Sequence, residues 1–441
     1  MTVATNIRKA SVHPAFGLFD EACGTATQQQ IILKLCREVE KLPAEPFSAG
    51  NAITHSLLEK GWRYGLHTYC LKDMLSLRAG NCLGLSALYG ALLTARGFQP
   101  EYELVIGPQS YQSRDEQELL EHLLSGQAFS FHSPVLPERQ EGGEKLLFCT
   151  QEHPRLVLGG ELFETTALQQ QGPSDIRGQR VRKLNYTGLM GLVYYERAHQ
   201  ALINDARTAS RLLAQARKMD PDNHGVFAEE TDLSLASFDD DLFDRASKQL
   251  RDSDQKDSKN WLQKYCLFGV MSDLEKALGA NPTDMCAWPM KHVLCEGDVP
   301  NQRANFAVAA QCIARSEILN LGNYYATYAA RGAKLFPDHV VSLVKKSRDK
   351  STNPFGHHLA LALLGSCRGV VWKGRDKPHD HLAELNKRSS AFTPFQRTLL
   401  LYAAKRLSEG NGAWEKHLGQ FGERKTFKAT VDLMDRQWQG L

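Results

Sequence analysis

The chain has 441 residues, of which 42% are hydrophobic and 23% are charged, a composition typical of globular proteins. At roughly 100–200 residues per domain, this length predicts two or three packed domains. The 53 basic and 50 acidic residues leave a formal net charge of only +3. Such a charge supplies no field for holding a polyanion, so a nucleic-acid partner is not expected.

The apolar runs and the cysteines indicate the cellular compartment in which the protein is expected. The longest apolar runs, such as residues 359–364, fall short of the roughly 20 residues that a membrane-spanning helix needs. Residues 1–9 lack the apolar stretch that follows the basic end of a secretory signal. The 10 cysteines are scattered without a Cys-x-x-Cys pair, as expected of reduced thiols rather than of a disulfide framework. We therefore expect a cytoplasmic protein with no membrane association.

Residues 1–60 are predicted to form a helical lead-in. Residues 61–185 are predicted to form an α+β domain, because one strong helix is mixed there with alternating strand patterns and glycine-rich turns. That helix begins at or near Cys82 and carries leucines at helical spacing on one face. We expect Arg96 and Gly97 to end it, since a cation suits the negative end of a helix and glycine adopts the left-handed conformation.

The second half of the α+β domain is predicted to be mostly strands. A strand over residues 101–106 is expected, with two glutamates alternating against apolar residues. The polar stretch 108–144 then indicates an inserted loop or lid. Two further strands, 145–158 and 161–166, are separated by Gly159-Gly160, a link that favours a tight two-residue hairpin turn.

Residues 186–441 are predicted to be entirely α-helical, because helical patterns rich in Ala, Leu and Lys continue without a strand signal. At three places a small residue near a helix end is followed five positions later by proline: Ala216 and Pro221, Ala277 and Pro282, Gly332 and Pro337. These places resemble the end of a tetratricopeptide repeat, but the prolines recur at unequal intervals longer than its period of about 34 residues. This spacing is consistent with a degenerate helical-repeat array and also with an irregular all-helical domain.

Cys82 is the candidate nucleophile. Cysteine attacks a carbonyl carbon as a thiolate, and a helix N-terminus favours the thiolate through its unpaired N–H groups and its dipole. Gly80 and Asn81 allow the chain to turn sharply before the helix. We expect Gly84 to keep the first turn uncrowded, so that an acyl substrate can reach the sulfur.

The nucleophile needs a base, and the base needs an acceptor that orients it. With Gly159-Gly160 as a two-residue loop, Arg155 falls opposite Glu164 and His153 falls opposite Thr166. His153 and Glu164 are then diagonal neighbours on one face of the hairpin, with Cα atoms about 7–8 Å apart. Their side chains can bridge that distance.

Alternatives remain open at each position. His132 competes with His153 for the role of base, and Glu164 has a possible structural partner in Arg155 across the strands. An oxyanion hole would use the Cys82 N–H and a second donor from the preceding segment. The candidates for that second donor are Trp62, His67 and Tyr69.

Residues 78–89, followed by 96–98, resemble the nucleophile segment of bacterial transglutaminase-like domains, and residues 161–166 resemble their closing acidic strand. The resemblance covers roughly residues 61–170 and implies an α+β papain/transglutaminase-like fold. In that superfamily the order along the chain is Cys, then His on a strand, then Asp or Glu on the next strand. The resemblance therefore implies a catalytic triad of Cys82, His153 and Glu164, without a cofactor.

These patterns predict a cysteine hydrolase or acyltransferase, most simply a peptidase, whose helical half recognises a protein substrate or partner. A non-catalytic interaction protein with a relic transglutaminase-like domain is the alternative. The two remaining groups of possible metal ligands match no closed zinc site, so no metal is expected. These groups are Cys286, His292 and Cys295, and His379 with His381.

Overall fold

A computed structural model gives the fold of the chain. The residues that it describes are 14–23, 35, 37–65, 68–112, 132–134, 138–140, 143–145, 147–168, 180–202, 205–253, 258–280, 355, 358–359, 361–362, 377–407 and 411–438. The chain forms two compact units. The first consists of residues 1–109, 152–197 and 214–223, and the second of residues 110–151, 198–213 and 224–441.

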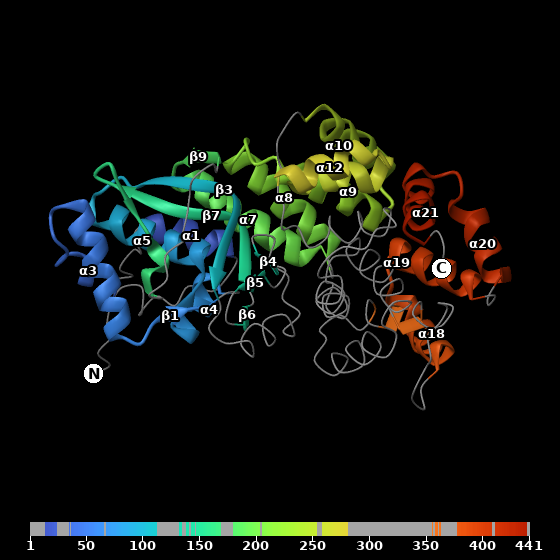
Figure 1. Ribbon diagram of the computed structural model, residues 1–441, viewed down its shortest axis with the longest axis horizontal. Coiled ribbons are helices and arrows are strands. Elements are labelled where there is room, and N and C mark those ends of the chain that lie inside the picture. Colours follow the sequence, from blue (N-terminus) through green and yellow to red (C-terminus); the bar gives the residue numbers. More distant parts are fainter. Residues whose placement is uncertain are drawn as a thin grey trace, which may run out of the picture. The chain divides into compact units, whose positions relative to one another are not determined.

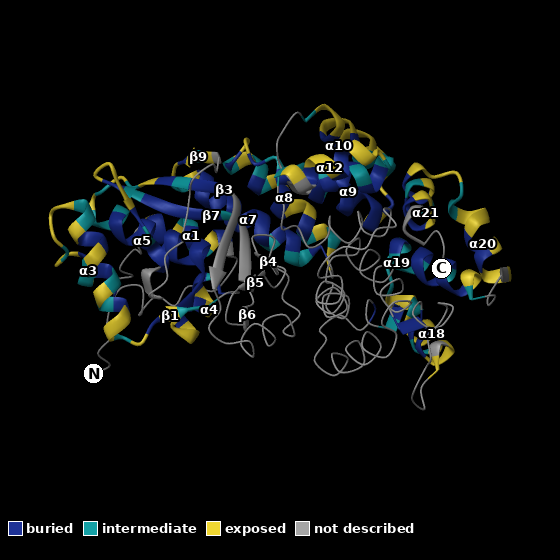
Figure 2. Cartoon of the chain, in the orientation of Figure 1, coloured by how far each residue is buried: buried dark blue, intermediate teal, exposed yellow. Residues whose placement is uncertain are grey.

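Helix α5 (Cys82–Arg96) is the centre of the first unit, and its residues from Cys82 to Leu93 are all buried. Helices α1 (Pro14–Cys23), α3 (Pro46–Glu59) and α4 (Leu71–Leu77) pack against it (Figure 1). In Figure 2, α5 is accordingly dark blue over most of its length. The expected helical lead-in is therefore part of the same core as the helix that carries Cys82.

The ends of α5 follow the local sequence. Asn81 is the N-cap, and its side chain accepts a hydrogen bond from the N–H of Gly84 at 2.8 Å. Gly97 ends the helix in the left-handed conformation, with φ of 97°. The predicted start at Cys82 and the predicted stop at Gly97 are both confirmed.

The unit also contains part of a five-stranded sheet with strand order β4-β7-β3-β9, in which β8 pairs with β7. The strands are β3 (Glu101–Gln112), β4 (His132–Pro134), β7 (Leu147–Leu158), β8 (Glu161–Phe163) and β9 (Arg180–Leu184). Tyr102 of β3 is fully buried, and a Cβ on Gly90 of α5 would lie 1.8 Å from its hydroxyl oxygen. Glycine at position 90 thus lets α5 pack closely against the sheet.

The hairpin between β7 and β8 has the predicted register. Gly159 and Gly160 have φ values of 61° and 86°, as a two-residue type I′ turn requires. Leu158 pairs with Glu161, and Leu156 pairs with Phe163. The second strand ends at Phe163, however, whereas the sequence predicted a strand to residue 166.

A 3-10 helix, η1 (Thr165–Leu168), replaces the end of that predicted strand. The N–H of Thr166 donates to Oε1 of Glu164 at 3.0 Å. A local side-chain bond of this kind competes with the ladder of a sheet, which explains why the strand stops before Glu164. The expected cross-strand pairs beyond Leu156 and Phe163 are replaced by this turn.

The stretch 108–144 was expected to be a loop-like insertion or lid with a short helix around residues 116–124. The parts of it that the structure describes are strands, whereas residues 116–124 lie outside the described residues and the insertion remains a prediction. Strand β3 continues to Gln112, and β4 pairs with β7 through residues 148–150. Two short strands, β5 (Glu138–Gln140) and β6 (Gly143–Lys145), pair with each other. Residues 107–112 of β3 carry no apolar and polar alternation, so the sequence gives no strand signal there.

Every element that the structure describes after Leu184 is helical, as expected. These helices are α7 (Tyr186–Ala201), α8 (Ala206–Met219), α9 (Gly225–Ser237), α10 (Asp240–Asp252), α11 (Ser258–Phe268), α12 (Met271–Ala280), α18 (Pro378–Lys387), α19 (Pro394–Arg406), α20 (Asn411–Phe421) and α21 (Lys425–Trp438), with a short 3-10 helix η3 (Ser389–Ala391). One cluster of their core contains Leu262, Leu274, Ala277 and Leu433. None of the described helices is both long enough and apolar enough to cross a bilayer.

Of the proposed repeat positions, Ala216 and Ala277 are fully buried in α8 and α12. A Cβ on Gly191 of α7 would lie 2.6 Å from Cβ of Asp220, just after α8, so small residues allow these two helices to approach. Pro282, Gly332 and Pro337 lie outside the described residues. The tetratricopeptide-like repeat therefore remains a prediction.

Candidate active site

Cys82 is positioned by a short parallel ladder in front of its helix. Strand β1 (Arg63–Tyr64) pairs with β2 (Ala79–Gly80), which brings the chain to the start of α5. The N–H of Asn81 then donates to the carbonyl oxygen of Thr68 at 2.8 Å. These backbone bonds fix the direction from which the chain enters the helix.

Cys82 is the first residue of α5, so its N–H has no acceptor within the helix. This N–H and the positive end of the helix dipole both favour a negative charge near the sulfur. The side chain is 0% exposed. The position suits a thiolate, but the sulfur is covered in this conformation.

The space beside the first turn is occupied by protein. A Cβ on Gly84 would lie 2.7 Å from Cα of Tyr69 and 3.0 Å from the carbonyl oxygen of Thr68. The expectation that Gly84 opens a path for substrate is therefore wrong. Glycine is required there because the backbone of residues 68–69 crosses the start of the helix.

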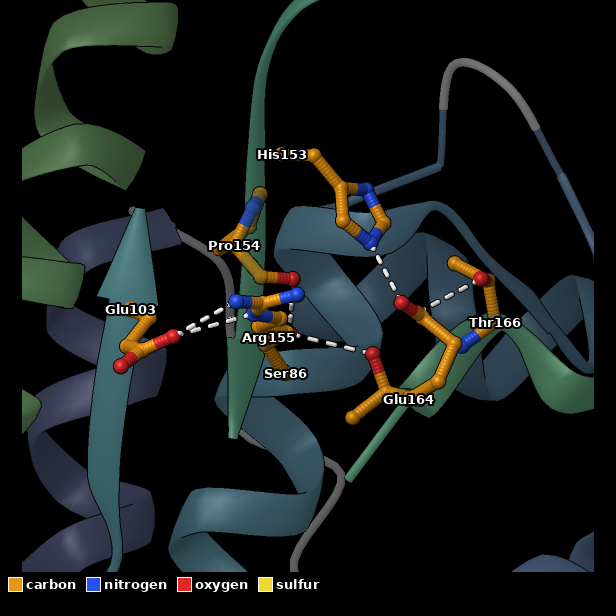
Figure 3. Close-up of polar contacts among 8 residues, drawn as sticks. Ser86, Glu103, His153, Pro154, Arg155, Glu164 and Thr166 are labelled. Atoms are coloured by element: carbon orange, nitrogen blue, oxygen red, sulfur yellow. Dashed lines mark hydrogen bonds and ion pairs between the residues drawn. The ribbon is translucent and has the colours of Figure 1, made fainter. Parts of the chain in front are cut away.

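His153 and Glu164 meet as predicted, although Glu164 follows the end of β8 and is not part of the paired strands. The Nε2–H of His153 donates to Oε2 of Glu164 at 2.8 Å, and Figure 3 shows the two side chains pointing toward each other. His153 is buried in β7, whereas Glu164 follows β8 and is 23% exposed. An ionised carboxylate only accepts, so the proton lies on Nε2.

The alternative pairing of Glu164 with Arg155 is wrong. Arg155 donates to Oε2 of Glu103 in β3 from Nη2 at 2.8 Å and from Nε at 3.1 Å (Figure 3). This pair ties β7 to β3 next to the histidine. Arg155 therefore stabilises the strand that carries His153 and leaves Glu164 to the imidazole.

The pKa values of both residues are shifted, in opposite directions. Burial alone would lower the pKa of His153, but attraction to the Glu164 carboxylate and hydrogen bonds with Cys82 and Glu164 raise the pKa to about 10. Burial would likewise raise the pKa of Glu164, but the charge of His153 and hydrogen bonds from His153 and Thr166 lower it. The pair is therefore an imidazolium and a carboxylate at neutral pH.

Cys82 is the third member of the group, because a hydrogen bond with its side chain and its charge both contribute to the raised pKa of His153. Because Nε2 is engaged by Glu164, Nδ1 is the ring nitrogen left for the sulfur. The three predicted site residues thus come together in one unit. The competing base, His132, lies in β4 opposite Thr150, and its side chain lies outside the described residues.

Several positioning residues were missed in the sequence. Both the N–H and the hydroxyl of Thr166 donate to Oε1 of Glu164, at 3.0 and 2.6 Å. Ser86 contacts the carbonyl of Pro154 and the hydroxyl of Thr165, each at 3.1 Å. The available signals were adjacency to Glu164 for the threonines and, for Ser86, a place one helical turn after Cys82.

The structure describes only some of the other candidate residues for the oxyanion hole and for metal binding. Trp62 and Tyr69 are buried, while His67 lies outside the described residues. Within the described part of the chain, no group of three or more His, Cys, Asp or Glu side chains is arranged to hold a metal ion. His381 has Nδ1 at 3.0 Å from Nδ1 of His358. Cys286, His292 and Cys295 lie outside the described residues.

Comparisons with models of protein families, with curated proteins and with solved structures give no match. The class of protein is therefore defined by the fold and the site alone. The fold combines a mixed helix-and-sheet part with a helical part, and the site joins a buried cysteine, a histidine and a glutamate.

Proposed function

We propose that this protein is a transglutaminase-like cysteine hydrolase or acyltransferase, most simply a peptidase that cleaves a protein amide bond. The observation that carries the proposal is the chain from Cys82 through His153 to Glu164. A sulfur at a helix N-terminus, a histidine in contact with it and a carboxylate that orients the histidine are the parts that covalent catalysis by cysteine requires.

The proposed reaction begins with attack of the Cys82 thiolate on the carbonyl carbon of the substrate, which forms a C–S bond. The His153 imidazolium gives its Nδ1 proton to the leaving amine as the C–N bond breaks. The acyl-enzyme then reacts with water, whose proton passes to Nδ1 as the new C–O bond forms and the thiolate leaves. Glu164 keeps the ring oriented and stabilises its positive charge throughout.

The second nucleophile decides between the members of this class. Water gives a peptidase or a deamidase, and a substrate amine gives a cross-linking transglutaminase, since all three share the acyl-enzyme. We propose the peptidase as the simplest case, in a cytoplasmic protein whose helical part binds a protein substrate or partner. The α+β fold of the first part supports a papain/transglutaminase-like core.

The burial of Cys82 favours a second candidate function, that of a non-catalytic scaffold in which the cysteine site is a relic. A sulfur that is 0% exposed must be uncovered before any substrate reaches it. A relic site has no need to open, and its helical part would then serve only to bind a partner. The two candidates differ in the reactivity of Cys82.

The test is alkylation of the full-length protein by iodoacetamide at pH 7, followed peptide by peptide with mass spectrometry. Cys266 is the matched control, because it is also buried, at 3% exposure, but lies in a helix interior in α11. We expect Cys82 to be labelled at least about tenfold faster than Cys266, since an activated thiolate reacts whenever the site opens. Labelling of Cys82 no faster than Cys266 would support the scaffold.

A further inference from the structure

Ser86 links α5 and β7, which carry Cys82 and His153, to η1, which begins directly after Glu164. It lies in α5 one helical turn after Cys82, and its side chain is fully buried. Its Oγ lies 3.1 Å from the carbonyl oxygen of Pro154 in β7 and 3.1 Å from Oγ1 of Thr165 in η1. Figure 3 shows Ser86 and Pro154 beside the His153 and Glu164 pair.

The direction of these hydrogen bonds follows from their chemistry. A carbonyl oxygen only accepts, so the single hydroxyl proton of Ser86 is donated to Pro154. The Oγ of Ser86 must then accept from the hydroxyl of Thr165. The result is an ordered chain from Thr165 through Ser86 to Pro154, in a buried environment where such chains strengthen one another.

Each end of this chain is next to a member of the proposed triad. Pro154 follows His153 directly, and Thr165 follows Glu164 directly. Strand β7 pairs with β8 only at residues 156–158, and proline has no N–H to give to a ladder. Strand β7 also pairs with β3, and beyond its short pairing with β8 the carbonyl of Pro154, next to His153, accepts its hydrogen bond from Ser86 of α5.

We propose that Ser86 and Thr165 are positioning residues that set the distance between the Cys82 sulfur, His153 and Glu164 in the proposed cysteine enzyme. The inference rests on the proposed function, because the distance matters for the reaction of the thiolate. Ser86 fixes the strand of the histidine to the helix of the nucleophile, and Thr165 fixes the turn of the glutamate to the same helix.

The two variants that break this chain are Ser86→Ala and Thr165→Val, the second of nearly unchanged shape. Thr165→Ser, which keeps the hydroxyl, should behave as the wild type. Tyr89→Phe is the matched control, because it removes a buried hydrogen bond of the same helix, from Tyr89 to Thr54 of α3 at 2.8 Å. Circular dichroism establishes that each variant is folded.

Two readouts separate positioning from general stability. The first is the rate of Cys82 alkylation at pH 7, which should fall about tenfold to a hundredfold, since a misplacement of about 1 Å has such an effect. The second is the NMR titration of labelled His153, assigned with His153→Gln. Its pKa should move down from about 10, because its hydrogen bonds with Cys82 and Glu164 weaken.

The outcomes are distinguishable. The proposal holds if Ser86→Ala and Thr165→Val change both readouts while Thr165→Ser and Tyr89→Phe change neither. It is overturned if both variants keep the wild-type titration of His153, or if Tyr89→Phe causes equal losses. If wild-type Cys82 reacts no faster than Cys266, the proposed enzyme fails and the positioning role in catalysis fails with it, whatever the titration shows.

Discussion

The Nε2 of His153 donates to Oε2 of Glu164 at 2.8 Å, while the other carboxylate oxygen of Glu164 accepts from Thr166. One oxygen of the Glu164 carboxylate therefore binds the imidazole, and the other binds Thr166 in the turn that fixes the carboxylate. This arrangement fixes the orientation of the ring, with Nε2 toward Glu164.

Replacing Glu164 with Gln should lower the pKa of His153 from about 10 toward its ordinary value of 6.5. Burial favours the neutral ring and is opposed by the charge of Glu164, by hydrogen bonds and by Cys82, so loss of the Glu164 charge removes part of what raises the pKa. NMR titration of labelled histidine measures the change. Glu161→Gln, on the exposed tip of the same hairpin, is the control and should leave the titration unchanged. If the pKa of His153 is the same in Glu164→Gln as in the wild type, the carboxylate is not the cause of the raised pKa.

The same pair predicts how stability depends on pH. The folded-state pKa of His153, about 10, lies above the value of 6.5 expected in the unfolded chain. The stability that protonated His153 contributes is thus complete below pH 6.5 and is lost as pH rises toward 10. Denaturant unfolding at pH 6.5, 8 and 9.5 should show the wild type and Glu164→Gln converging as pH rises. A difference between them that stays constant over this range would contradict the shift.

Much of this site could be predicted from local sequence. Asn81 and Gly97 set the two ends of α5, and Gly159-Gly160 set the hairpin register, because caps and two-residue turns depend on a few adjacent residues. The register alone placed His153 and Glu164 on one face. These features need no information from distant parts of the chain.

The features that could not be predicted from the sequence depend on contacts between residues that are far apart along the chain. The role of Gly84 follows from the backbone at Tyr69, and that of Ser86 follows from Pro154 and Thr165. Tertiary contacts of this kind leave no periodic signal.

Replacing Gly84 with Ala should destabilise the fold, by about 1–3 kcal/mol as is usual for overpacking. The new Cβ would lie 2.7 Å from Cα of Tyr69, and a backbone atom cannot move aside as the end of a side chain can. Thermal or urea unfolding measures the loss. Gly17→Ala in α1 is the control, because nothing lies within 4 Å of the added Cβ. That variant should be stabilised by about 0.5–1 kcal/mol, the helix preference of alanine over glycine. Equal stability of the Gly84 and Gly17 variants would contradict the close approach.

Replacing Thr166 with Val should weaken the hold on Glu164 without filling or emptying the buried site. The variant loses the hydroxyl that donates to Oε1 at 2.6 Å and keeps the N–H that donates at 3.0 Å. The pKa of Glu164 should rise, because that hydroxyl is among the hydrogen bonds that lower it against the effect of burial. A carboxylate with a lowered pKa contributes stability at pH values above its unfolded-state pKa of 4.5, and that contribution is lost as pH falls.

The free energy of unfolding of the wild type should therefore exceed that of Thr166→Val by about 1.5–3 kcal/mol near pH 6, as for a hydrogen bond to a charged group. The difference should be smaller at pH 3. Urea unfolding at both pH values tests this, with Thr166→Ser as the control that keeps the hydroxyl, and a deficit that is equal at the two pH values would assign the loss to packing.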